Sequence, residues 1–208
     1  MKYSTNKKFI FFHVPKVPGS TIARALELYT NANTGPMHLY RFENVKPERL
    51  DGFVGNNDVH VSASEVKKKL RAKYEKYFTF SFVRNPWDWC ISIYHYISQT
   101  PSHRGFNLYN RYGNFANYVK SSSQKHLQSD WFFDKENKPC VDFIGKFETL
   151  QQDFNTICDK IGIPRQKLPH KNKSNHKHYT EYYDDETRQI VAELYAKDID
   201  YFEYEFGE

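Results

Sequence analysis

The sequence predicts an α/β fold of three layers, in which a central, mainly parallel sheet is flanked by helices. Short β-prone runs, most clearly Phe9–Phe12 and Phe78–Val83, alternate with segments of helical periodicity. Strands separated by helices form βαβ units, whose strands run parallel. The chain of 208 residues has the length of one domain with a sizeable core, so we expect a single domain over residues 1–208.

The first expected unit is a strand, a turn and a helix. Four apolar residues, Phe9–Phe12, predict a short buried strand. Two prolines and Gly19 mark a turn, and the helical pattern that follows covers Thr21–Tyr29. Residues 30–58 are rich in Asn, Gly and Pro, and we expect a long excursion of the kind that often serves function.

The second half of the predicted sheet begins with a short strand at Asp58–Ser62. Ser62 and Glu65 have the spacing of a capping box, which opens a helix over Glu65–Tyr74. Pro86 directly follows the run Phe78–Val83 and is well placed as the first residue of a helix. The later elements are expected to be a helix at Gly113–Ser121, a strand at Val141–Lys146, a helix at Glu148–Ile161, a basic loop at Pro164–His178 and a mostly helical segment at Asp184–Phe202.

Composition limits the possible partners and compartments. The 30 basic and 25 acidic residues give a net charge of +5, which suits an anionic ligand but does not imply nucleic acid. No apolar run approaches the roughly 20 residues that span a bilayer, and we expect neither a transmembrane segment nor a signal peptide. Three scattered cysteines without a CxxC pair favour neither a disulfide framework nor a zinc site, so a reducing cytoplasm is the expected compartment.

The turn after the first strand has the features of an anion site. The free N–H groups of a helix start point toward the turn, the helix dipole adds partial positive charge, and Lys16 adds a full one. A Walker A loop reads GxxxxGK[ST], whereas Lys16 comes three residues before Gly19 and no GK[ST] occurs. This disfavours a magnesium-dependent ATPase or GTPase. Taken alone, the turn could also be a surface turn that binds nothing.

The loop HxPKxxGST resembles the 5′-phosphosulfate loop of sulfotransferases that use 3′-phosphoadenosine 5′-phosphosulfate (PAPS), in the carbohydrate branch (uronyl 2-O and chondroitin-type enzymes). The resemblance implies a P-loop-like fold. It departs at Val17, where Thr is usual, and at Pro18, which lacks an N–H and stands where Ala or Gly is usual. The donor-binding residues that the resemblance implies here are Lys16, Pro18, Gly19, Ser20, Thr21 and Ile22.

A second motif, FSFVRNPWD followed by Ser92 and Tyr94, resembles the family's 3′-phosphate site, FxxRNPxxRxxSxY. The resemblance implies that Arg84 and Ser92 bind the 3′-phosphate, which ATP lacks. A guanidinium binds phosphate in a bidentate manner, and a hydroxyl adds a directional bond. Trp89 stands where the family's second Arg is usual. The alternative is that Arg84 is a helix-edge surface charge and Ser92 lies on a solvated helix face.

The segment around His60 resembles the HVS segment that carries the catalytic base of uronyl 2-O-sulfotransferases. An imidazole has a pKa near the working pH and can accept a hydroxyl proton. His60 could instead be a core or substrate-positioning histidine, and Asp58 and Glu65 are rival bases. The family's closing loop resembles the segment Pro169–Asn175, which implies cofactor contacts for Asn172, Lys173 and Ser174, unless this is simply a solvated basic loop.

Together these residues predict an enzyme, a PAPS-dependent sulfotransferase of EC 2.8.2 type, with PAPS as donor, PAP as product and no metal. Lys16 and His60 are the expected catalytic residues, and the strand ends His13–Lys16, His60–Ser62 and Arg84 are expected at one sheet edge. The expected acceptor is a hydroxyl of a glycan or a glycosylated metabolite, in a bacterial cytoplasm. The alternatives are an ATP-dependent, kinase-like P-loop protein and an inactive nucleotide-binding module. No oligomeric state follows from the sequence.

Overall fold

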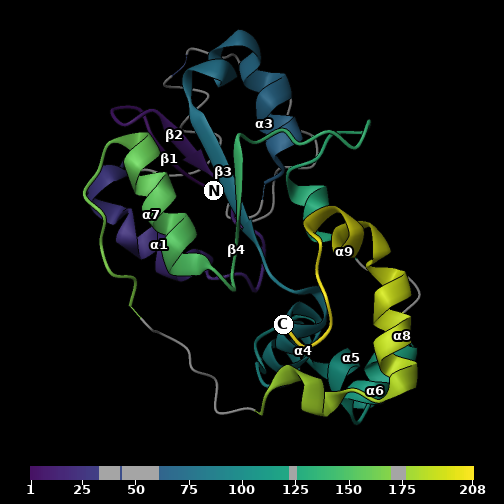
Figure 1. Ribbon diagram of the computed structural model, residues 1–208. Helices are drawn as coiled ribbons and strands as arrows, with labels where there is room; N and C mark the ends of the chain where they lie inside the picture. The colour runs from purple at the N-terminus through teal and green to yellow at the C-terminus, as the bar shows by residue number, and fades with distance from the viewer. Residues whose placement is uncertain (33–42, 44–60, 122–125, 170–176) are drawn as a thin grey trace. The chain divides into compact units, whose positions relative to one another are not determined.

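The computed structural model describes residues 1–32, 43, 61–121, 126–169 and 177–208 (Figure 1). These residues form two compact units. Unit 1 comprises Met1–Val83 and Gln128–Lys171, and unit 2 comprises Arg84–Leu127 and Asn172–Glu208. The single domain over residues 1–208 stays a prediction.

Unit 1 contains a four-stranded sheet in the order β1-β2-β3-β4, in which β2, β3 and β4 run parallel and β1 pairs antiparallel with β2. Phe11 of β2 pairs with Phe80 of β3, and Val83 of β3 pairs with Lys146 of β4. This confirms the mainly parallel sheet. The strands are β1 (Lys2–Ser4), β2 (Phe9–Phe11), β3 (Phe78–Val83) and β4 (Phe143–Lys146).

Aromatic side chains cover one face of this sheet. Phe11 stacks on Phe80 with ring centroids 5.2 Å apart and meets Phe82 edge-on at 6.4 Å. Gly145 of β4 makes room for this layer, because a Cβ there would lie 2.4 Å from the Phe82 ring. Helix α7 (Leu150–Ile161) packs along β4 on this face, and its Asp153 accepts the amide of Lys146 at 2.8 Å (Figure 1).

The opposite face of the sheet carries Phe12 and Ser81, because side chains alternate along a strand. Tyr74 approaches the Phe12 ring at 6.4 Å and donates to the carbonyl of Cys140 at 2.7 Å. Tyr74 belongs to the 3₁₀ helix η2 (Arg71–Lys76), which follows α3 (Ala63–Leu70). The Ser62 half of the predicted capping box is confirmed, since the Ser62 hydroxyl accepts the Glu65 amide at 3.4 Å, whereas the helix runs over Ala63–Leu70 instead of the predicted Glu65–Tyr74. Residues 58–60 of the predicted strand Asp58–Ser62 lie outside the described residues. The remaining two, Val61 and Ser62, are not in a strand.

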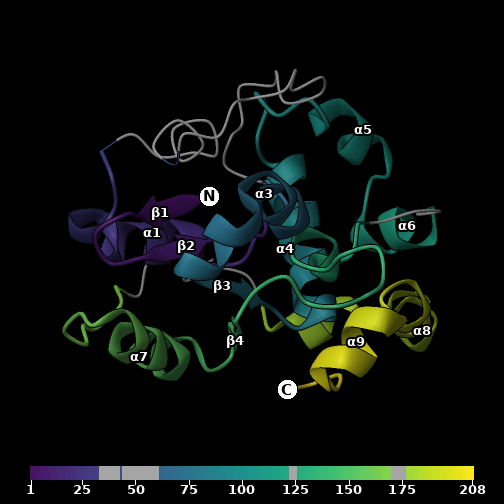
Figure 2. The same cartoon turned by 90° about the horizontal axis from the view of Figure 1, so that it is seen from above.

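Helices are the only regular secondary structure among the described residues of unit 2 (Figure 2). Helix α4 begins at Pro86, as predicted, and Asn85 caps it by accepting the Trp87 amide at 3.1 Å. Helix α5 was not predicted, because it is short and none of its residues is buried. The helices are α4 (Pro86–Ser98), α5 (Phe106–Arg111), α6 (Phe115–Lys120), η4 (Tyr179–Tyr182), α8 (Asp185–Leu194) and α9 (Ala196–Phe202).

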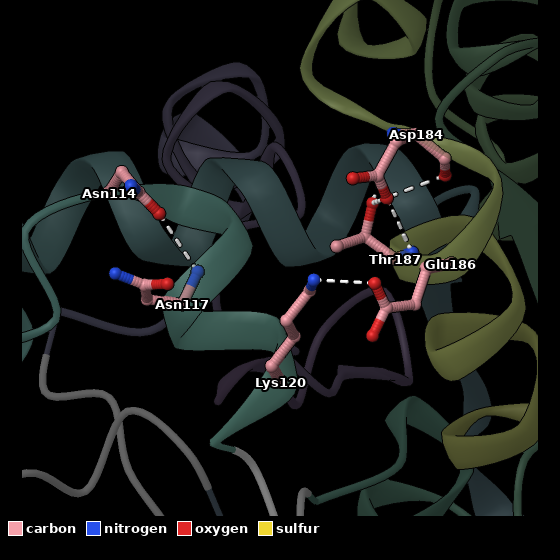
Figure 3. Close-up of polar contacts among 6 residues, drawn as sticks. All are labelled: Asn114, Asn117, Lys120, Asp184, Glu186 and Thr187. Carbon is pink, nitrogen blue, oxygen red and sulfur yellow. Dashed lines mark hydrogen bonds and ion pairs between the residues drawn. The ribbon is translucent and has the colours of Figure 1, made fainter.

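Polar contacts fix the start of α8 and join it to α6 (Figure 3). The Asp184 carboxylate accepts the Thr187 amide at 2.7 Å, and the Asp184 amide donates to the Thr187 hydroxyl at 3.0 Å, which completes a capping box. Lys120 of α6 pairs with Glu186 of α8 at 2.5 Å. Within the described ranges, no helix has both the length and the apolar character needed to cross a bilayer.

Candidate functional site

The loop between β2 and α1 (Gly19–Ala25) folds back on itself. Val14 and Val17 are both buried, Val17 with 6% of its surface exposed, and the Val17 amide donates to the Val14 carbonyl at 3.4 Å. Val17 is therefore an apolar anchor of the loop, and its burial is a physical reason for a side chain without a hydroxyl where Thr is usual. Lys16 between these contacts is half-buried and has a φ of 60°, which an L residue adopts at a cost of about 1 kcal/mol.

Gly19 starts α1 in a position that leaves no room for a side chain. A Cβ at Gly19 would lie 1.8 Å from Cδ2 of His13 and 1.9 Å from its Nε2. The His13 ring is itself stacked on Phe11, with centroids 6.1 Å apart. The close approach of the loop's first and last residues therefore depends on glycine, which the motif contains at this position.

The amides of the first turn of α1 divide into two groups. The Gly19 amide donates to the Val17 carbonyl at 2.5 Å, and the Ile22 amide donates to the Pro18 carbonyl at 3.0 Å. The sequence predicted that the amides from Gly19 to Ile22 all serve an anion. In this conformation the Ser20 and Thr21 amides are the two of this turn that donate to no other described residue. The Ser20 side chain is exposed, whereas that of Thr21 is buried.

Arg84 is the first residue of unit 2, directly after the last residue of β3. Its Nε and one terminal guanidinium nitrogen both donate to Oδ2 of Asp88, each at 2.6 Å. Both side chains are largely buried, with 13% of Arg84 and 15% of Asp88 exposed. Ser92 follows one helical turn after Asp88 and is partly buried. Asp88 and Ser92 are four residues apart within α4, so they lie on one side of this helix, and Asp88 contacts Arg84 just before it.

The start of α4 is anchored to the C-terminal segment of unit 2. The Trp87 indole donates to the Arg188 carbonyl at 3.0 Å, and the Tyr183 hydroxyl donates to the Trp87 carbonyl at 2.8 Å. The Asn85 side chain donates to the Glu205 carbonyl at 2.8 Å. Burial raises the pKa of Tyr183 well above its usual value, so this hydroxyl stays a donor. These contacts hold the residues around Arg84 in a defined backbone conformation.

Several predicted site residues lie outside the described residues: His60 and its rival Asp58, and the three candidates of the closing loop, Asn172, Lys173 and Ser174. The third candidate base, Glu65, is exposed in the first turn of α3. In the part of the chain that the structure describes, no group of three or more His, Cys, Asp or Glu side chains could hold a metal. All three cysteines are buried and unpaired with one another.

Of the three predicted strand ends, two belong to neighbouring strands. β2 and β3 are parallel partners, so their carboxyl ends lie at the same sheet edge. The Lys16 loop follows β2, and Arg84 follows β3. Reasoning from the sequence missed Asp88 and the His13–Gly19 contact. The spacing of opposite charges at i and i+4 was a signal for the first, whereas the second depends on the loop conformation.

The sulfotransferase family profile matches residues 1–205. An uncharacterized protein of Archaeoglobus fulgidus is 32% identical over 114 residues, covering 50% of this chain and 80% of that protein. Carbohydrate sulfotransferase 14 of Mus musculus is 22% identical over 194 residues, covering 77% of this chain. The chain spans 46% of the length of that mouse protein.

The crystal structure of the mouse sulfotransferase SULT7A1 complexed with PAP is similar in fold. It matches with a TM-score of 0.52 at 15% identity, over 95% of this chain and 86% of that chain. The predicted P-loop-like α/β fold is thereby confirmed. Since the family match runs from residue 1 to residue 205, the chain belongs to the sulfotransferase family.

Proposed function

We propose that this protein transfers a sulfuryl group from PAPS to a hydroxyl of a glycan or a glycosylated metabolite. The observation that carries the proposal is that two neighbouring parallel strands, β2 and β3, lead into a lysine loop and an arginine. PAPS has anionic groups at both the 5′ and the 3′ position of its ribose, so it needs two cationic contacts. The mouse structure of similar fold is a complex with PAP, which supports a donor of this class.

The Lys16 loop would hold the 5′ end of the donor. The Ser20 and Thr21 amides and the Ser20 hydroxyl are suited to donate hydrogen bonds to phosphate oxygens, with Pro18, Gly19 and Ile22 shaping the turn. Arg84 and Ser92 would hold the 3′-phosphate. In the same proposal, Asn172, Lys173 and Ser174 close over the donor.

The proposed reaction is an in-line displacement at sulfur. The acceptor oxygen forms a bond to sulfur while the bond from sulfur to the bridging phosphate oxygen breaks, and PAP leaves with that oxygen. His60 takes the acceptor's proton, and Lys16 stabilises the charge that develops on the bridging oxygen. Positioning of donor and acceptor supplies much of the rate, as in phosphoryl transfer. Lysine, arginine and helix-end dipoles neutralise the leaving group without a metal.

A carbohydrate acceptor is proposed because a relative of this chain is named a carbohydrate sulfotransferase. The inactive module is the main rival, since Val17 and Pro18 depart from the family's loop. The kinase-like alternative would require ATP and magnesium, for which the loop lacks the GK[ST] sequence. A reducing compartment is part of the proposal, as the three cysteines are not joined to one another.

Calorimetry and labelled-sulfate transfer test the proposal together. We expect tight binding of PAP without magnesium, weak binding of ATP, and transfer from labelled PAPS to at least one member of a panel of glycans. Lys16→Ala and His60→Ala should each lower turnover by about 10²-fold or more, while His60→Ala leaves PAP binding intact. Tight ATP binding that requires magnesium would favour the kinase-like protein. PAP binding without transfer to any acceptor would favour the inactive module.

A further inference from the structure

Arg84 lies in an environment where its charge needs a counter-ion. It immediately precedes Asn85, the N-cap of α4, so it lies beside the positive end of the helix dipole. Only 13% of its side chain is exposed, which limits the water that can solvate the guanidinium. Asp88, the third residue of α4, supplies the opposite charge at 2.6 Å.

The contact between Asp88 and Arg84 joins one carboxylate oxygen to two guanidinium nitrogens. An acidic side chain in the first turn of a helix is stabilised by the dipole without any partner. Asp88 instead directs a single oxygen, Oδ2, at both Nε and a terminal nitrogen of Arg84. Contacts at two nitrogens restrict how the guanidinium can turn as well as where it lies, and its orientation decides whether its other edge can bind a phosphate in a bidentate manner.

We propose that Asp88 is a positioning residue, which holds the Arg84 guanidinium in the orientation that binds the donor's 3′-phosphate. This inference rests on the proposed function. Ser92 lies on the same side of α4, one turn beyond Asp88, so the hydroxyl and the oriented guanidinium can serve one phosphate group. Asp88 fixes a long, flexible side chain before the ligand arrives, and binding then costs less conformational entropy.

Binding of two ligands that differ only in the 3′-phosphate tests this role. PAP carries this phosphate, whereas adenosine 5′-phosphate lacks it. Asp88→Asn should weaken PAP binding by about tenfold, which is the cost of reordering one long side chain, and leave adenosine 5′-phosphate binding unchanged. Asp88→Glu, which retains a carboxylate, should restore most of the PAP affinity. In an Arg84→Ala background, Asp88→Asn should cause no further loss.

Glu186→Gln is the matched control. It removes one negative charge from the first turn of another helix in unit 2 and breaks an ion pair, that with Lys120 (Figure 3). It should leave both affinities unchanged. Equal weakening of both ligands by Asp88→Asn would mean a merely structural role, and unchanged or tighter PAP binding would mean that Asp88 only competes with phosphate. Either result overturns the inference while the proposed function stands. A wild-type protein that binds no PAP would overturn both.

Discussion

At the scale of single residues, the loop after β2 is shaped by one close approach. His13 and Gly19 stand at its two ends, and the histidine ring occupies the space that a side chain at Gly19 would fill. Val17 fixes the middle of the loop by burial, and Lys16 is left in a strained left-handed conformation. Strain of this kind persists only where the surroundings enforce it, and it is often found at functional sites. The motif thus encodes a conformation as well as a charge.

Gly19→Ala should therefore destabilise the protein, by about 1–3 kcal/mol, because the new methyl group must displace the His13 ring. The measurement is the free energy of unfolding from denaturant titration. His13→Ala combined with Gly19→Ala removes the clash, so the double variant should be more stable than the sum of the two single effects predicts. Additive losses in the double variant would show that His13 is not what excludes a side chain at Gly19.

At the scale of elements, helix starts are fixed by side chains next to them in sequence. Ser62, Asn85, Asn114 and Asp184 each accept an amide of the helix that follows. Such caps can be predicted from sequence because donor and acceptor are only two or three residues apart. The contacts that join one element to another link residues far apart in the chain. The Tyr74 hydroxyl reaches the Cys140 carbonyl across 66 positions of the chain, and no local pattern indicates it.

The Asp184 cap gives a prediction about pH. Hydrogen bonds from the Thr187 hydroxyl and amide hold the pKa of Asp184 below its usual value. Since the folded pKa is the lower one, the carboxylate stabilises the fold above its unfolded pKa of about 3.9, and this contribution is lost as the pH falls through the folded value. Asp184→Ala should lower the melting temperature at pH 7, and the difference from wild type should shrink below about pH 4.

Asp184→Asn is the control for this titration. Asn is also a good N-cap, but it carries no charge that titrates. Its melting temperature should therefore follow that of the wild type more closely than the alanine variant does at pH 7. If the difference between Asp184→Ala and wild type were the same at pH 3 and pH 7, the carboxylate would not be the origin of the stabilisation.

At the scale of the whole molecule, binding of the proposed donor should be coupled to folding. A ligand that binds only the folded state stabilises it by mass action. PAP at about 100 times its dissociation constant should add about 2.7 kcal/mol to the free energy of unfolding, seen as a higher melting temperature. EDTA should change neither this shift nor the rate of sulfuryl transfer. Loss of either in EDTA would contradict a metal-free site.

Much of the fold was predictable from local pattern. The strand Phe78–Val83 and the helix start at Pro86 have the predicted bounds, because a β-prone run and an N-terminal proline are local signals. The antiparallel strand β1 was missed, because three residues are too few to show a period. Of the site, Lys16, Gly19, Arg84 and Ser92 were identified by motif, and their roles stay predictions.

The sequence by itself determined most of the strands and helices, the cap at Ser62, and which family the motifs resemble. These properties depend on residues close together in the chain, so composition and spacing are enough to express them. Only the tertiary structure decided that the Gly19 and Ile22 amides bond within the loop, that His13 requires glycine at position 19, and that Asp88 holds Arg84. Those outcomes depend on how side chains compete for space and for hydrogen-bond partners once the chain is packed.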